Sequence, residues 1–158
     1  MTTLLLVRHG ETVDNVRQIM QGQTQGELTP NGIEQARALA VELKDTPIDV
    51  FVSSDLKRAF DTCVILAAAH GVSPDAIVQT KLLRERDWGS FTGRYIPDLK
   101  DARWTDDIES LDALRARAAA FLQFVRDNYE GKTIDTVTAE DFDQNSYQEK
   151  PCLPWDTA

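Results

Sequence analysis

Short apolar runs alternate with longer amphipathic segments, and this alternation limits the possible folds more than any other feature of the chain. Apolar residues that recur every three or four positions predict helices, and compact apolar runs predict strands. Strands are expected at residues 3–7, 48–52 and 77–79. Long helices are expected at about residues 30–44, 55–70 and 110–128. Strands that alternate with helices favour the α/β class, here a three-layer α/β/α fold with a mostly parallel central sheet.

Each predicted helix carries an apolar stripe that is expected to pack on the sheet. The first helix has Thr29 as its cap and Pro30 at its first position, where the missing N–H of proline costs no hydrogen bond. The stripes of the three helices, in chain order, are Ile33, Ala36, Leu39, Ala40 and Leu43; Leu56, Ala59, Phe60, Cys63, Val64 and Ala67; and Leu111, Leu114, Ala118, Phe121, Leu122 and Val125. These stripes account for a core that needs no bound cofactor.

Polar residues follow the first two predicted strands where each strand ends. Arg8 and His9 come directly after the apolar residues 4–7. Ser54 follows the second strand and is expected to cap the next helix, with Arg58 one turn further on. In an open α/β sheet, ligands bind beyond the carboxyl ends of the strands, and helix N-termini and arginines suit phosphate. The sequence therefore predicts a phosphate site at this edge of the sheet.

Several segments, in a fixed order, carry a family resemblance over roughly the first 134 residues. They are Leu6–Thr12 with Asn15, Gln21–Gly22, Leu28–Gly32, Ser53–Ala59 and Leu83–Gly89, followed by a weaker match at Glu109, Ser110 and Arg117. Their order and spacing resemble the phosphatase-type branch of the histidine phosphatase superfamily, also called the phosphoglycerate mutase-like family. The resemblance implies a phosphoglycerate mutase-like fold and chemistry on phosphate monoesters. No cofactor is expected, and the two scattered histidines argue against a metal site.

The resemblance also implies roles for individual residues. His9 is implied as the nucleophile that attacks phosphorus, and Glu85 as the acid that protonates the leaving oxygen. Cations beside His9 disfavour protonation of the imidazole and so keep it available as a nucleophile. The implied phosphate-binding residues are Arg8, Asn15 and Arg58, and the implied substrate-binding residues are Gln21 and Gly22.

Some of these residues also have plainer interpretations. Arg58 taken alone is a solvated cation on a helix face. Glu85 taken alone is a surface carboxylate paired with Arg84 or Arg86. Aromatic side chains after Glu85 either wall the substrate pocket or belong to the core: Trp88, Phe91, Tyr95 and Trp104.

The chain departs from the family pattern at one catalytic position. The family carries a second histidine at the end of a later strand, and here Ala139 and Glu140 stand where the resemblance implies His-Gly. Losing one donor to a transition-state oxyanion costs about 2.7–4 kcal/mol, which is roughly a hundredfold to a thousandfold in rate. His70 is the only other histidine, and its place at a helix end before Gly71 favours a structural role.

The chain is expected to form one domain at residues 1–139, followed by a divergent polar tail at residues 140–158. Apolar patterning fades after Ile134, and Asp135 is expected to interrupt a strand that would otherwise be buried on both faces.

Composition excludes several other classes. The formal net charge of −9 argues against a nucleic-acid partner. The two cysteines, Cys63 and Cys152, have neither metal-site nor disulfide-framework spacing, and the apolar run at residues 4–7 is too short to span a membrane, so a cytoplasmic location is expected. Gly131-Lys132-Thr133 resembles the end of a nucleotide-binding P-loop, but it follows a helix and lacks the required earlier glycine.

The sequence therefore favours a phosphate-monoester phosphatase that acts through phospho-His9, on a small phosphorylated metabolite, with activity weakened by the missing second histidine. Three alternatives remain open: a catalytically inactive phosphate-binding or interaction module, a phosphoglycerate mutase-type phosphoryl transfer enzyme, and a phosphohistidine phosphatase.

Overall fold

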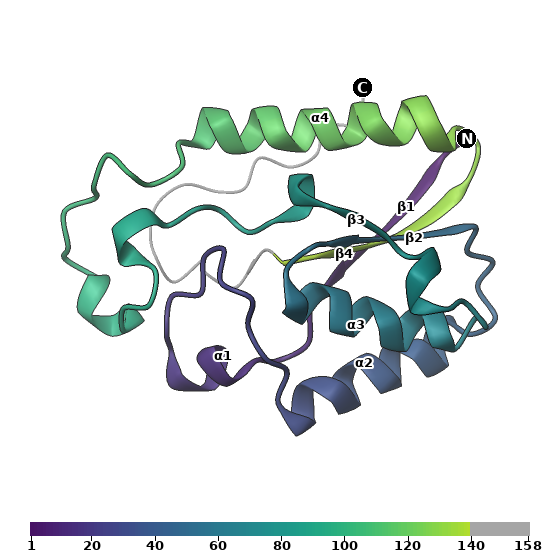
Figure 1. Cartoon of the computed structure of the whole chain (residues 1–158), viewed down its shortest axis with the longest axis horizontal. Helices are drawn as coiled ribbons and strands as arrows, with labels where there is room; N and C mark the ends of the chain where they lie inside the picture. Colours follow the sequence, from purple (N-terminus) through teal and green to yellow (C-terminus); the bar gives the residue numbers. More distant parts are fainter. Residues whose placement is uncertain (140–158) are drawn as a thin grey trace.

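A parallel sheet forms the centre of the computed structural model, which describes residues 1–139 (Figure 1). Its strands are β1 (Thr3–Arg8), β2 (Val50–Ser54), β3 (Val78–Thr80) and β4 (Thr133–Thr138). The strand order is β1-β4-β2-β3, and each neighbouring pair is parallel. The last strand of the described chain therefore lies between the first two.

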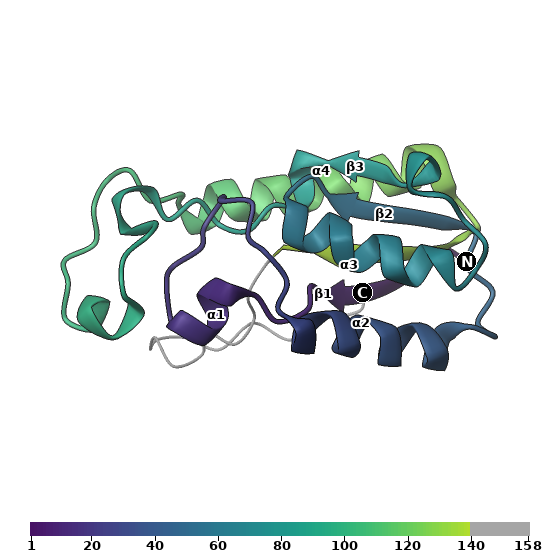
Figure 2. The same cartoon turned by 60° about the horizontal axis from the view of Figure 1, so that its bottom comes forward.

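Helices cover both faces of this sheet. They are α1 (Val13–Arg17), α2 (Pro30–Leu43), α3 (Lys57–Ala68) and α4 (Leu111–Tyr129). Figures 1 and 2 show α2 and α3 side by side on one face and α4 on the opposite face. The predicted three-layer α/β/α fold is therefore confirmed.

Two apolar clusters hold the layers together. The cluster under α2 and α3 includes Ala40, Phe51, Ala59, Leu66 and Val137. The cluster under α4 includes Val52, Leu83, Phe121, Val125 and Ile134. Each cluster contains residues from a helical layer and residues from the strands. The apolar stripes of the helices and the faces of the sheet therefore bury one another.

The start of α3 differs from the prediction. Leu56, rather than Ser54, is the N-cap residue, and it makes no side-chain capping hydrogen bond. Ser54 is the last residue of β2, and its Oγ accepts a hydrogen bond from Leu56 N at 3.2 Å. The serine thus shapes the turn between strand and helix instead of capping the helix.

The predicted apolar stripe of α4 was wrong in its first half. The Leu111 side chain is 53% exposed and Ala118 is also exposed, whereas Phe121 and Val125 are buried. The first turns of α4 extend beyond the strands, so only its second half packs on the sheet (Figure 1).

The expectation that Asp135 interrupts the last strand was also wrong. β4 continues through Asp135, which is 0% exposed and pairs in register with Leu5 of β1 and Phe51 of β2. Neither of its carboxylate oxygens has a hydrogen-bond partner among residues 1–139. Burial raises the pKa of Asp135 to about 7, while the nearby His70 acts in the opposite direction. Backbone pairing on both sides therefore keeps the strand intact although its side chain is poorly suited to the interior.

The predicted polar tail at residues 140–158 lies outside the described residues. Within residues 1–139, none of the helices has the length and hydropathy needed to cross a membrane.

His70 joins the ends of two helices, in agreement with a structural role. Its Nε2 lies 3.0 Å from Leu43 O and 3.2 Å from Thr46 O, and its Nδ1 lies 3.2 Å from Leu66 O. The ring also contacts Phe51, with centroids 5.3 Å apart. These contacts fix the end of α3 against the end of α2.

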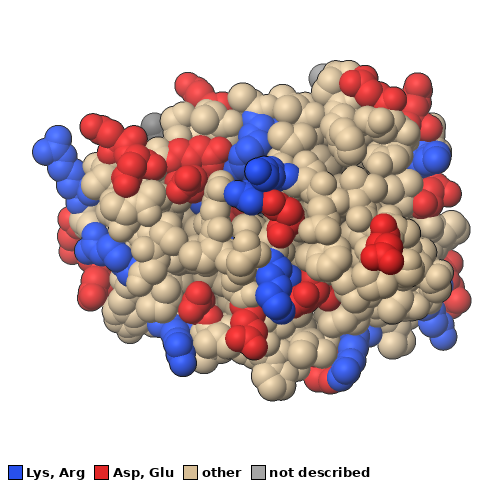
Figure 3. Space-filling view, in the orientation of Figure 1, with Lys and Arg blue, Asp and Glu red and all other residues tan. Residues whose placement is uncertain are grey.

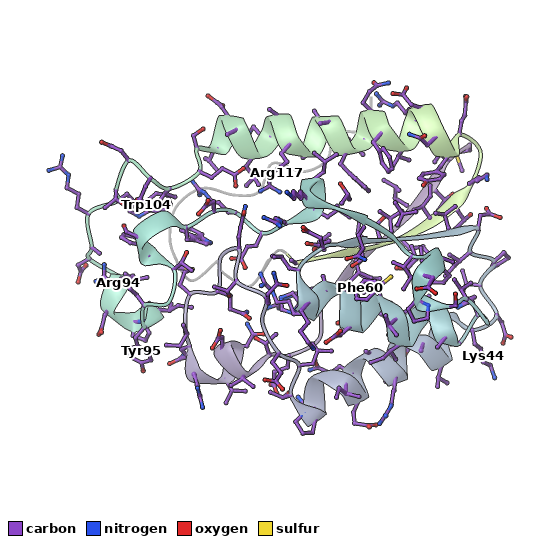
Figure 4. The ribbon with its side chains drawn as sticks, in the orientation of Figure 1. Lys44, Phe60, Arg94, Tyr95, Trp104 and Arg117 are labelled. Carbon is purple, nitrogen blue, oxygen red and sulfur yellow. The ribbon has the colours of Figure 1, made fainter. Side chains whose placement is uncertain are left out.

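We expect His70→Ala to lower the free energy of unfolding by about 2 kcal/mol, because it removes the ring's hydrogen bonds at the ends of both helices and the contact with Phe51. Urea unfolding monitored by circular dichroism measures this loss. Lys44→Ala is the control, since Lys44 is exposed at the same end of α2 (Figure 4). Equal urea midpoints for His70→Ala and Lys44→Ala would contradict the structural role of His70.

Candidate functional site

The carboxyl ends of β1 and β4 place His9 beside position 139. The register pairs Arg8 with Thr138, and His9 N donates to Thr138 O at 3.3 Å. His9 therefore follows the end of β1, and Ala139 follows the end of β4. His9 is 4% exposed, whereas the Arg8 side chain is exposed.

Contacts around His9 select one tautomer of the neutral ring. His9 Nδ1 lies 2.7 Å from Gly10 O, and a carbonyl oxygen accepts but cannot donate. In the neutral imidazole Nδ1 thus carries the proton, which leaves the lone pair on Nε2. Gly10 N donates to Thr62 Oγ1 at 3.0 Å, and Thr62 Oγ1 donates to Arg58 O at 2.8 Å, so the loop after β1 is tied to α3.

Arg58 is fully buried at this edge of the sheet. The interpretation as a solvated surface cation is therefore wrong: its exposed fraction is 0%. Its guanidinium donates to main-chain oxygens of Thr24 (2.6 Å), Gly22 (2.9 Å) and Ala139 (3.0 Å). These contacts bring the loop before α2, the first turn of α3 and the end of β4 to one point.

Glu85 meets Arg58 in the same buried region. Arg58 Nη2 lies 2.8 Å from Glu85 Oε2, and Glu85 is 3% exposed. The expected pairing of Glu85 with Arg84 or Arg86 is therefore wrong. Arg84 pairs with Asp55 at 2.6 Å instead, and this hydrogen bond lowers the pKa of Asp55 below its ordinary value.

The residues implied to bind substrate, Gln21 and Gly22, and the implied phosphate-binding residue Asn15 make hydrogen bonds within the protein. Gln21 is buried, and its Oε1 accepts a hydrogen bond from Thr12 Oγ1 at 2.8 Å. Asn15 Oδ1 accepts from Thr12 N at 2.9 Å, which completes a capping box at the start of α1. Gly22 presents its carbonyl to Arg58. Gly26 has a φ of +72°, and a Cβ there would lie 2.9 Å from Arg58 Cδ, so only glycine lets the loop approach the arginine this closely.

Arg117 supports the Glu85 segment from α4, and sequence reasoning assigned it no such role (Figure 4). Its guanidinium donates to Arg84 O at 2.6 Å and Glu85 O at 3.3 Å, and it pairs with Glu109 at 2.8 Å. Arginine bonded to successive carbonyls holds a segment that has no regular hydrogen-bond ladder. The weak motif match at Glu109 and Arg117 was the only signal in the sequence for this clamp.

A surface hollow of about 490 Å³ lies beside this clamp. Its walls include Lys81, Arg84, Asp87, Asp107, Glu109 and Arg117, but none of His9, Arg58 and Glu85. Figure 3 shows cationic and anionic side chains intermixed on this face of the molecule. Within the part of the chain that the structure describes, no group of three or more His, Cys, Asp or Glu side chains is arranged to hold a metal ion.

Comparison with known proteins gives one family. The profile of the histidine phosphatase superfamily, branch 1, matches residues 4–142. Phosphoglycerate mutase-like protein 4 of Arabidopsis thaliana is 36% identical over 151 residues, covering 85% of this chain and 65% of that protein. The uncharacterized phosphatase PhoE of Bacillus subtilis is 35% identical over 138 residues, covering 85% of this chain and 69% of that protein.

Solved structures agree with this result. The phosphoserine phosphatase of Entamoeba histolytica, crystallised with 3-phosphoglyceric acid, superposes with a TM-score of 0.75 at 30% identity, covering 87% of this chain and 74% of that one. The chain spans about half to two thirds of the length of the first curated relatives it matches.

Proposed function

Because the chain belongs to branch 1 of the histidine phosphatase superfamily, we propose that it is a phosphate-monoester phosphatase whose nucleophile is His9. The observation that supports this most directly is the convergence of His9, Arg58 and Glu85, all nearly or fully buried, at the carboxyl edge of the sheet. Phosphoryl transfer depends mainly on positioning and on charge stabilisation, and these residues supply a nucleophile, a cation and an acid.

In the proposed first step, His9 Nε2 attacks phosphorus, a nitrogen–phosphorus bond forms, and the bond from phosphorus to the ester oxygen breaks. Glu85 gives its proton to the leaving alkoxide, so that an alcohol departs. In the second step, water attacks phospho-His9, and Glu85 takes a proton from that water. Inorganic phosphate leaves, and His9 is restored.

The Arg58–Glu85 pair must open for this sequence to begin. In the absence of substrate, Arg58 neutralises the Glu85 carboxylate at 2.8 Å. A phosphate dianion bound to Arg58 competes for the guanidinium, and its own charge favours protonation of Glu85. Substrate binding thus converts Glu85 from the partner of an arginine into an acid.

We propose a small phosphorylated metabolite as substrate, since the Entamoeba relative is a phosphoserine phosphatase crystallised with 3-phosphoglyceric acid. A relative in Arabidopsis thaliana, 33% identical, is named metal-independent phosphoserine phosphatase. A second candidate is a non-catalytic phosphate-binding module. The observation that favours it is Ala139, which stands beside His9 without a group able to donate to phosphate.

His9→Ala is expected to abolish release of inorganic phosphate from an aryl phosphate, because no other described side chain at the site offers a neutral nitrogen nucleophile. His70→Ala, which removes the only other histidine, is expected to retain the wild-type rate at a temperature where it stays folded. Acid-labile radioactive phosphate should be trapped on the wild-type protein and on His70→Ala only. Phosphate binding without turnover would support the binding-module alternative, and transfer to a second alcohol in place of water would support a mutase.

A further inference from the structure

We infer that Trp88 is a positioning residue for Glu85, holding one carboxylate oxygen so that the other is presented to the substrate. This inference rests on the proposed role of Glu85 as the acid. Trp88 Nε1 donates to Glu85 Oε1 at 3.0 Å, while Glu85 Oε2 lies 2.8 Å from Arg58 Nη2. The two oxygens of the carboxylate therefore have different partners.

The Trp88 indole is held firmly enough to fix Glu85. Trp88 is buried in a small apolar cluster with Met20, Phe91 and Leu99. It also meets Trp104 in a T-shaped contact, with centroids 5.5 Å apart. An indole held by these contacts keeps its N–H direction, and a hydrogen bond to a carboxylate is of the stronger, charge-assisted kind.

Arg86 reinforces this arrangement. Its guanidinium carbon lies 5.0 Å from the Trp88 ring centroid and 4.9 Å from that of Trp104. Its Nε donates to Glu109 O at 2.7 Å, which anchors the cation to the segment before α4. The cation therefore lies beside both rings, on the segment that Figure 1 shows projecting from the sheet edge.

The arrangement assigns different tasks to the two Glu85 oxygens. Oε2 is on the side of Arg58, where the phosphate is proposed to bind, so Oε2 is the oxygen that transfers the proton. Oε1 stays with Trp88 when Arg58 turns to the phosphate, and the carboxyl group keeps its orientation. A donor to the ionised carboxylate also favours that form, so loss of the indole N–H makes Glu85 hold its proton to higher pH.

Trp88→Phe tests this inference, because phenylalanine keeps an aromatic ring in the cluster and removes the donor. For an alkyl phosphate, whose leaving oxygen needs a proton, we expect kcat to fall about tenfold with KM nearly unchanged. For an aryl phosphate, whose leaving group departs without a proton, we expect less than about a twofold change. The basic limb of the kcat profile should move to higher pH.

Trp104→Phe is the matched control. It keeps an aromatic ring against Trp88 and leaves the hydrogen bond from Trp88 to Glu85 in place, since Trp104 is 53% exposed and the described contacts give it no hydrogen bond to Glu85. It is expected to retain the wild-type ratio of alkyl to aryl turnover and the wild-type pH profile. The same ratio and profile in Trp88→Phe as in Trp104→Phe would overturn the inference.

A measurement that needs no turnover separates this inference from the proposed function. The indole N–H resonance of Trp88 in the ¹⁵N NMR spectrum is identified by its loss in Trp88→Phe. Its chemical shift should change with pH as Glu85 titrates, and it should change when inorganic phosphate is added. In Glu85→Gln the dependence of this chemical shift on pH should disappear. A wild-type protein with no turnover would contradict the phosphatase activity, and this resonance alone would then decide the inference. A Trp88 indole chemical shift that changes neither with pH nor in Glu85→Gln would overturn the inference.

Discussion

Replacement of Asp135 by valine is expected to raise the free energy of unfolding by about 4 kcal/mol at pH 8 and by less than about 2 kcal/mol at pH 5. Asp135 is 0% exposed in the middle of β4, with no hydrogen-bond partner for its carboxylate among the described residues. Burial raises its pKa from 3.8 to about 7. Each unit of pKa corresponds to about 1.4 kcal/mol, which gives the size of the effect.

The direction with pH follows from the two protonation equilibria. In the unfolded chain Asp135 loses its proton near pH 3.8, whereas in the folded protein it keeps the proton up to about pH 7. Stability contributed by this group is therefore highest in acid, falls as pH rises from about 4 to 7, and stays low above that range. Valine does not titrate, so its advantage over aspartate grows across the same range.

Urea unfolding at pH 5 and pH 8 measures this difference. Asp135→Asn keeps the shape and polarity of the side chain but cannot ionise. It should therefore show the pH-dependent part of the increase in the free energy of unfolding. Thr136→Val is the control on the other face of β4, where an unpartnered hydroxyl is also buried; its gain should be smaller and independent of pH. A gain from Asp135→Val that is the same at both pH values would show that Asp135 does not titrate between them.

The second large effect is expected for Ala139→His, which should increase kcat for phosphate monoesters by about a hundredfold to a thousandfold. Register places position 139 beside His9 on the neighbouring strand, and Ala139 O already accepts a hydrogen bond from Arg58. An imidazole introduced there would donate to a phosphate oxygen opposite His9, at the position where the family resemblance implies a histidine. The donor would stabilise charge that develops in the transition state.

Two controls isolate the donor from the added volume. Ala139→Leu introduces a side chain of similar bulk without a hydrogen-bond donor, and it should not raise kcat. The double variant His9→Ala with Ala139→His should remain inactive, because in the proposed mechanism the added imidazole assists His9 and does not replace it. Equal rates for the leucine and histidine variants would contradict the proposed role of position 139.

Much of the fold could be predicted from local signals. Thr29 and Pro30 specify where α2 begins, and the helix expected at about residues 30–44 is observed as Pro30–Leu43. The positions of β1, β2 and β3 were correct to within two residues, since compact apolar runs mark them. The strand order could not be predicted, because insertion of β4 between β1 and β2 depends on tertiary packing. The buried Asp135 was missed for the same reason, since pairing on both sides outweighs its side chain.

The candidate site was only partly predictable. His9, Arg58 and Glu85 were found through motifs, and the structure brings Arg58 and Glu85 together across 27 positions of the chain. Their pairing depends on the path of the loops and not on a local pattern. The Thr62 bridge and the Trp88 hydrogen bond were missed, because a threonine within a helix and a tryptophan in an apolar cluster look like ordinary core residues.

The position of β4 has a consequence for how the protein is made. β4 separates β1 from β2 by two strand spacings, or about 10 Å, and among residues 1–139 it is the only strand that pairs with β1. Synthesis begins at the N-terminus, so His9, Arg58 and Glu85 all emerge before Thr133–Thr138. A growing chain therefore holds every proposed catalytic side chain before the proposed active site can form. The proposed site forms only when β4, the last of the four strands to be translated, takes its place between β1 and β2.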